Sequence, residues 1–178
     1  MLCFLSSYSF GHGLKSATAN IEVRPNNLVE LKVQFDLKKL LNHNSNQYSI
    51  PILAALSEEK FALLYNEIIK LFDNHLQIKN GDKSISINKR YPSQQQIRQV
   101  IKRQFIKSKL MAKQAVEPYT FSDRRYYQVF YFDFKLNVKN DLEALSISFP
   151  PELGNIYITF SESSNHEIHS GEKWQLNR

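Results

Sequence analysis

The stretch "ATANIEVRPNNLVELKVQFD", residues 17–36, decides the fold class of this chain. On either side of Pro25-Asn26-Asn27, every second residue is apolar. These alternating positions are Ala17, Ala19, Ile21 and Val23, followed by Val29, Leu31, Val33 and Phe35. A period of two is typical of a β-strand that buries one face, and Pro and Asn favour a turn. The stretch therefore predicts a β-hairpin with a single buried face.

Further strands follow from the same pattern. "HLQIKNGDKSISIN", residues 75–88, predicts a second hairpin. Asn80-Gly81 would supply the positive-φ pair of a type I′ turn, and Leu76 and Ile78 would then lie opposite Ile85 and Ile87.

The segment "RRYYQVFYFDFKLNV", residues 124–138, predicts a long strand. One face would carry Phe130, Phe132, Phe134, Leu136 and Val138. The other would carry Tyr127, Val129, Tyr131 and Asp133, for which Arg125 is a natural partner. We expect two later strands in 142–149 and 154–161, and a short last one around Trp174 and Leu176.

Two helices are predicted between these strands. Ser57 is a good N-cap, and apolar residues at helical spacing follow it, which indicates a helix over about 58–73. Pro92 and Ser93 open a second helix over about 93–113. Its expected core-facing stripe consists of Ile97, Val100, Ile101, Leu110 and Met111, broadened by Phe105 and Ile106. Residues 37–43 suggest one helical turn, and 42–56 look irregular.

Together these elements predict a mainly β fold with two helices (α+β). We expect an antiparallel, immunoglobulin-like β-sandwich of about eight strands with a helical insertion between strands 2 and 5. The chain has 178 residues, 42% of them apolar, which suits one domain over 12–178. No run of eighteen apolar residues occurs, so no transmembrane segment is expected.

Charge is concentrated in one segment. The chain carries 23 Lys and Arg against 17 Asp and Glu, and nine of the basic residues fall in 83–116, which has no acidic one. The second predicted helix presents this charge on one face. We expect that face to be solvated or to contact an anionic surface, through Arg98, Lys102, Arg103, Lys107, Lys109 and Lys113. Only Tyr91 and Phe105 could stack on bases, so a nucleic-acid partner is not favoured.

The first eleven residues resemble the remnant of an export signal. They are apolar, although no basic residue precedes them, and Ser9-Phe10-Gly11 places small residues where signal peptidase requires them. Cleavage there would leave an extracytoplasmic, periplasmic chain that begins at His12. The alternative is a buried first strand of a cytosolic protein.

Metal binding is a second hypothesis. An N-terminal His12 could chelate copper through its α-amine and imidazole when another histidine joins. His166 and His169, three residues apart in "HEIH", are candidate ligands, and the alternative for them is an exposed loop. Cys3 is the single cysteine, which excludes an intrachain disulfide and a cysteine-based zinc site.

No catalytic motif is present. The chain lacks a G-x-S-x-G nucleophile elbow and a Gly-rich phosphate loop, and its only cysteine lies in the leading segment. We therefore expect a binding protein and not an enzyme.

Two segments carry a family resemblance. "GHGLKSATANIEVRPNNLVELKVQFDLKKLL", residues 11–41, is similar to the start of mature exported bacterial proteins, and "LEALSISFPPELGNIYITFSE", residues 142–162, resembles their closing strands. In that group the domain stands alone or precedes a membrane region of the HupE/UreJ type, which is linked to nickel or cobalt uptake. The resemblance implies an exported domain and carries over no functional residue.

The sequence thus predicts an exported binding domain that contacts a membrane-associated partner. One alternative is a periplasmic copper- or nickel-binding protein that uses His12. The other is an intracellular nucleic-acid binder that uses the basic helix, residues 89–113.

Overall fold

The hairpin predicted from residues 17–36 forms the centre of a five-stranded sheet in the computed structural model, which describes residues 17–42, 48–112, 127–137 and 144–163. Strands β1 (Ala17–Val23) and β2 (Leu28–Asp36) pair antiparallel. The 3-10 turn η1 (Pro25–Asn27) joins them, and Asn26 and Asn27 both adopt positive φ. Asparagine tolerates this left-handed backbone better than most residues, so the turn sequence suits its geometry.

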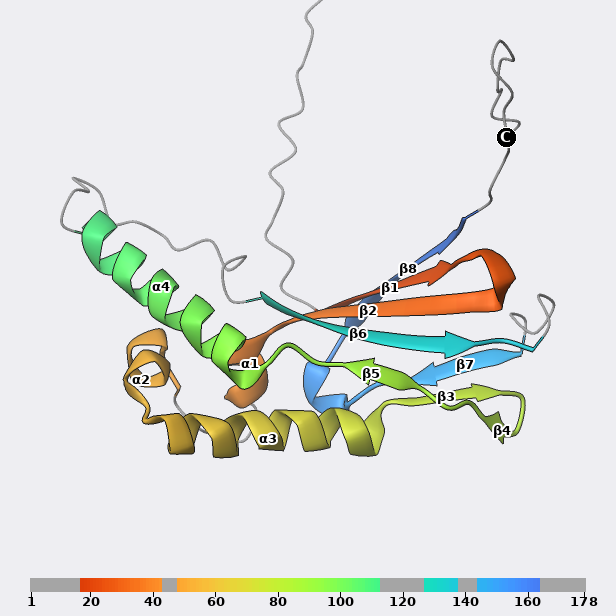
Figure 1. Ribbon diagram of the computed structural model, residues 1–178, viewed down its shortest axis with the longest axis horizontal. Coiled ribbons are helices and arrows are strands. Elements are labelled where there is room, and N and C mark those ends of the chain that lie inside the picture. Colours follow the sequence, from red (N-terminus) through yellow and green to blue (C-terminus); the bar gives the residue numbers. More distant parts are fainter. Residues whose placement is uncertain (1–16, 43–47, 113–126, 138–143, 164–178) are drawn as a thin grey trace, which may run out of the picture.

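Three more strands complete this sheet, in the order β5-β6-β2-β1-β8 (Figure 1). Strand β6 (Tyr127–Lys135) pairs antiparallel with β2, and β5 (Asn88–Arg90) pairs antiparallel with β6. Strand β8 (Ile156–Glu162) runs parallel to β1. The expectation of purely antiparallel strands was therefore wrong for this pair, because β8 enters the sheet beside β1 after a crossover from the second sheet.

The second sheet has three strands in the order β4-β3-β7. Strands β3 (Gln77–Asn80) and β4 (Lys83–Ser84) form the second predicted hairpin, and β7 (Leu145–Ser148) pairs with the other edge of β3. The Ile85 N–H donates to the Ile78 carbonyl over 2.9 Å, so these two apolar residues lie opposite each other. The loop residues are Gly81 and Asp82, and only Gly81 has positive φ, so the turn is not the predicted Asn80-Gly81 type I′ turn.

The part of the chain that the structure describes contains four α-helices. The two predicted ones are α3 (Glu58–His75) and α4 (Gln94–Ala112). Helix α1 (Leu37–Leu41) is the expected single turn, and the Asp36 carboxylate accepts from the backbone of Lys38 and Lys39 at its start. Helix α2 (Ile50–Ala55) corrects the irregular segment expected there, since Ser49 caps it and Pro51 fits its first turn. A 3-10 turn, η4 (Pro151–Leu153), precedes β8.

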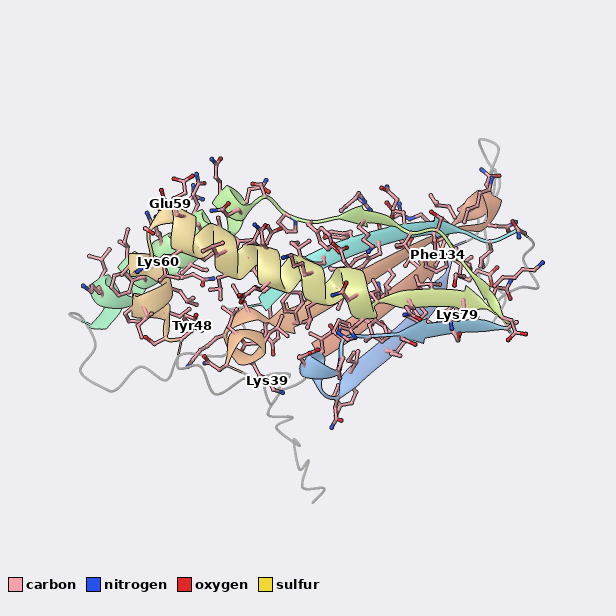
Figure 2. All side chains as sticks on the ribbon, turned by 90° about the horizontal axis from the view of Figure 1, so that it is seen from below. Lys39, Tyr48, Glu59, Lys60, Lys79 and Phe134 are labelled. Atoms are coloured by element: carbon pink, nitrogen blue, oxygen red, sulfur yellow. The ribbon has the colours of Figure 1, made fainter. Side chains whose placement is uncertain are left out.

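The two sheets and α3 form two layers around one hydrophobic core. Seen from below, α3 and the three-stranded sheet lie across the five-stranded sheet (Figure 2). The inner face of the large sheet buries alternate residues of β1, β2 and β6, and the core also includes Leu76 and Ile78. Over the described residues, the structure thus confirms a mixed α and β fold, with two open sheets. Among the described residues, no helix has the length and apolarity needed to cross a membrane.

Aromatic rings join these two layers. The Phe72 ring of α3 lies 5.3 Å from that of Phe35, 4.9 Å from that of Phe130 and 5.9 Å from that of Phe132. Phe35 and Phe130 also meet edge to face at 5.0 Å. Such contacts add to the free energy gained by burying each ring. Phe72 therefore connects α3 to two strands of the large sheet.

Replacing Phe72 with alanine should lower the free energy of unfolding by about 3–5 kcal/mol, because the ring is fully buried and would leave a cavity. Urea denaturation followed by circular dichroism measures the loss. Leu63→Ala, on the same helix at a side chain that is 67% exposed, should change stability by no more than about 0.5 kcal/mol. Equal losses in the two variants would contradict this description of the core.

Candidate anionic-surface site on helix α4

A reciprocal capping arrangement fixes where α4 begins. The Gln96 N–H donates to the Ser93 hydroxyl over 3.2 Å, and the Ser93 N–H donates to the Gln96 side-chain oxygen over 2.8 Å. This is the capping-box pattern, which satisfies two backbone donors at the start of a helix. The helix therefore starts at a defined residue directly after Pro92, as the sequence predicts.

Polar contacts hold the segment before α4 against α3. Asp73 of α3 accepts from the Lys89 ammonium over 2.7 Å and from the Tyr91 hydroxyl over 3.0 Å. Desolvation raises the pKa of Asp73, but the hydrogen bonds from Lys89 and Tyr91 outweigh it and leave the pKa below its ordinary value. The charged carboxylate is thus part of the joint between α3 and β5.

Two tyrosines add to this joint. The Tyr91 ring packs against Phe130 and Phe132, with centroids 4.9 and 5.8 Å away. Burial, followed by the hydrogen bond to Asp73, raises the pKa of Tyr91. The Tyr65 hydroxyl donates to the Pro92 carbonyl, and burial raises the pKa of Tyr65 to about 12. Both hydroxyls therefore stay protonated at neutral pH and serve as hydrogen-bond donors.

The first half of α4 is anchored to the helices beside it. Ile97 and Ile101 are buried in the core. The Arg98 guanidinium donates to the Leu56 carbonyl over 2.9 Å and lies 3.8 Å from the Glu58 carboxylate. Arg98 therefore holds α4 against the α2–α3 junction, and its charge is partly used within the protein.

The second half of α4 extends away from both sheets (Figure 1). Ile106 is 57% exposed and Leu110 is 60% exposed, and Val100 is also on the surface. The core-facing stripe expected from the sequence is therefore wrong at these three positions, although Ile97 and Ile101 are buried and Phe105 is partly buried against the core. At 100° per residue, Ile106 and Leu110 lie about 140–180° around the helix from the buried Ile97 and Ile101, so they face solvent, and Val100 lies at the margin of the buried face.

Four cationic residues flank the exposed side chains of Ile106 and Leu110. At 100° per residue, Ile106 and Leu110 lie on one stripe of the helix, with Arg103 and Lys107 along one side and Lys102 and Lys109 along the other. The Lys109 ammonium lies over the Phe105 ring, 4.6 Å from its centroid. We call this surface the α4 tip, and it comprises Lys102, Arg103, Ile106, Lys107, Lys109 and Leu110.

Four of the predicted site residues lie outside the part of the chain that the structure describes. They are His12, Lys113, His166 and His169. Within the described ranges, no group of three His, Cys, Asp or Glu side chains could hold a metal ion. The hypothesis of a copper or nickel site through His12 therefore stays a prediction.

A second ionic cluster lies on the outer face of the large sheet. Arg90 contacts Glu30 at 2.7 Å and Asp133 at 2.6 Å, and it lies over the Tyr131 ring. Hydrogen bonds to Asp133 and then Glu30 raise the pKa of Arg90. Asp133 lies on the face predicted for it, but its partner in the structure is Arg90, whereas the predicted partner Arg125 is outside the described residues. Spread over β2, β5 and β6, this cluster ties strands together.

Two of the hollows formed by the described residues are wide and open. One of about 310 Å³ lies beside α4 and is lined by Glu58, Gln95, Arg98, Gln99 and Lys102. The other, of about 790 Å³, lies at the opposite end of the molecule, where Asp82 and Lys83 of the β3–β4 turn meet Lys135 at the end of β6.

The comparisons with known proteins yield no relative: no protein-family model, no curated protein and no solved structure matches this chain.

Asp73→Asn should make stability depend less on pH. The folded-state pKa of Asp73 lies below the ordinary 3.8, so its stabilisation is present above about pH 4 and is lost as the pH falls through the folded-state value. We therefore expect the variant to lose stability at pH 7, and to lose less than the wild type on acidification to about pH 3. Urea unfolding at both pH values measures the difference.

Lys89→Gln should reduce the loss of stability between pH 7 and about pH 3 only in part, because the Tyr91 hydrogen bond to Asp73 remains. A full wild-type acid response in Asp73→Asn would show that the carboxylate does not stabilise the joint.

Proposed function

We propose that this protein is an exported binding domain that works at a membrane, where the α4 tip rests on anionic lipid headgroups beside a membrane-associated partner. The observation that supports it is the exposed Ile106–Leu110 pair, flanked on both sides by cations, on a helix half that extends beyond the core. Amphipathic helices with this arrangement lie in the membrane interface, with apolar side chains between the headgroups and cations beside the phosphates.

Electrostatics supplies most of the expected binding. Helix α4 carries five basic residues and no acidic one, and four of the five belong to the α4 tip. Each Lys or Arg near an anionic surface contributes about 1 kcal/mol. Burying the exposed parts of Ile106 and Leu110 adds about 1 kcal/mol each. Binding should therefore be reversible and should weaken as salt screens the surface.

The aliphatic pair favours lipid over nucleic acid as the anionic surface. Proteins that bind single strands present exposed aromatic rings on which bases stack. Of the two aromatic residues available here, Tyr91 packs on Phe130 and Phe132, and Phe105 is partly buried beneath Lys109. Ile106 and Leu110 offer no ring for stacking but are suited to insertion between lipids.

The proposal also includes export from the cytoplasm and an immunoglobulin-like β-sandwich fold. Export is supported by the apolar leading segment with Ser9-Phe10-Gly11 and by the resemblance to exported domains that can precede membrane regions. Two open sheets around one core support a β-sandwich related to the immunoglobulin type.

Vesicle sedimentation tests the proposal. The full chain should bind vesicles that contain phosphatidylglycerol and should not bind vesicles of phosphatidylcholine alone. Changing Lys102, Arg103, Lys107 and Lys109 to glutamine should lower the partition coefficient about 100-fold or more. Ile106→Ser with Leu110→Ser should lower it about 30-fold, because the cations remain but the inserted aliphatic surface is lost.

A matched control removes the same charge elsewhere. Changing Lys38, Lys70, Lys79 and Lys83, all exposed and outside α4, to glutamine should leave most of the binding intact. Equal losses in the two quadruple variants would show that only net charge matters, and the absence of binding to anionic vesicles would refute the proposal.

A further inference from the structure

Strand β8 forms one edge of the five-stranded sheet. It pairs with β1 on one side, and no strand of the described residues pairs with its other side. The strand is seven residues long, and Glu162 is its only charged residue. Natural sheets usually protect such an edge with Lys, Pro, a bulge or a short strand, because unpaired backbone groups there can pair with another chain.

The backbone direction of β8 follows from one hydrogen bond. The Ser163 N–H donates to the Val23 carbonyl of β1 over 2.8 Å. Successive residues of a strand point their backbone groups to alternate sides, so Tyr157, Thr159 and Ser161 also point towards β1. The N–H and C=O groups of Ile158 and Phe160 therefore point outward from the edge.

The side chains of these two residues are also exposed. Ile158 lies beside Ala19 and Phe160 beside Ile21, so both belong to the apolar inner face of the sheet. Ala19 and Ile21 are buried, whereas Ile158 and Phe160 are each 56% exposed. The edge thus offers outward backbone groups and apolar side chains at the same two positions, which is the combination that β-strand addition uses.

We propose that a second copy of this chain pairs with β8, strand against strand and antiparallel, so that the two large sheets join into one. A two-fold axis would pass beside Thr159, which then faces Thr159 of the second copy. Ile158 of each copy lies opposite Phe160 of the other, and Ile156 lies opposite Glu162. The Ile156–Glu162 and Ile158–Phe160 pairs each occur twice by symmetry. In this register the outward backbone groups of all four pairs can exchange both N–H···O=C bonds.

The sequence of β8 is complementary to itself in this register. On the inner face Ile158 of each copy meets Phe160 of the other and Ile156 lies opposite Glu162, Tyr157 meets Ser161 on the outer face, and the two Thr159 side chains lie side by side. No two like charges lie opposite each other. A partner strand of unrelated sequence would need the same alternation and length, whereas a second copy provides both.

Cross-linking tests this register directly. Residues in a non-hydrogen-bonded antiparallel pair have Cα atoms about 4.5 Å apart, within disulfide reach. In a Cys3→Ser background, Thr159→Cys should therefore form a covalent dimer on mild oxidation. Tyr157→Cys should form at least about tenfold less, because its two copies would be displaced by about four residues, or 13 Å along the strands.

Sedimentation equilibrium of the full chain tests the dimer without a cross-link. A one-strand interface is small, so we expect dimers at concentrations on the order of 100 µM. Phe160→Lys should raise the dissociation constant about tenfold or more, since it places a charge against the apolar Ile158 of the second copy. Leu63→Lys adds the same charge on α3, outside β8 and at a side chain that is 67% exposed, and should change it less than about twofold.

Each opposing result would overturn the proposal. A full chain that stays monomeric at concentrations well above about 100 µM would show that β8 does not pair with a second copy. A dimer that persists in Phe160→Lys, or that fails to cross-link through Thr159→Cys, would place the interface elsewhere or in another register.

Discussion

The rest of the structure depends on the contact between Phe72 and the rings on the inner face of the large sheet. A helix and a sheet with apolar faces must bury them against each other, and here a group of stacked and edge-to-face rings does so. The Tyr91 ring extends this group to the segment before α4, and its hydroxyl donates a hydrogen bond to Asp73 on α3. The same packing that closes the core therefore also sets the position and direction of α4.

This arrangement explains how one helix can be anchored and exposed at once. Ile97, Ile101 and Arg98 bind the first half of α4 to its neighbours, while Ile106 and Leu110 extend beyond them. A rigid base gives the exposed half a fixed orientation, so less conformational entropy is lost when it meets a surface. The proposed membrane contact thus follows from which face of α4 the core covers.

Local patterns in the sequence predicted most of the helices and strands, but fewer of the ways in which these elements pair and pack. The alternation in β1, β2 and β6 and the caps at Ser57 and Ser93 gave the correct strands and helices, because these signals act within a few residues. Helix α2 was missed because it is short and its Pro51 suggested an irregular segment. The parallel pairing of β8 with β1 joins residues more than 130 positions apart, and no local pattern encodes it.

The candidate site shows the same division. The sequence predicted a basic face on α4, but the stripe expected to face the core wrongly included Ile106 and Leu110. At 100° per residue these two lie about 140–180° around the helix from Ile97 and Ile101, so burial of the first pair leaves the second pair in solvent. The contacts of Asp73 with Lys89 and Tyr91, and the pairing of Asp133 with Arg90, join separate elements and gave no signal in the sequence.

The central claim is that the α4 tip inserts Ile106 and Leu110 between anionic lipid headgroups. The depth of a spin label at position 106 in the membrane tests it most directly. The label would be attached through Ile106→Cys in a Cys3→Ser background and compared with a label attached through Leu63→Cys on α3. With anionic vesicles present, the first label should become protected from a water-soluble relaxation agent and accessible to oxygen, while the second stays as it is in solution. Equal accessibility of the two labels, with the protein bound, would contradict the account.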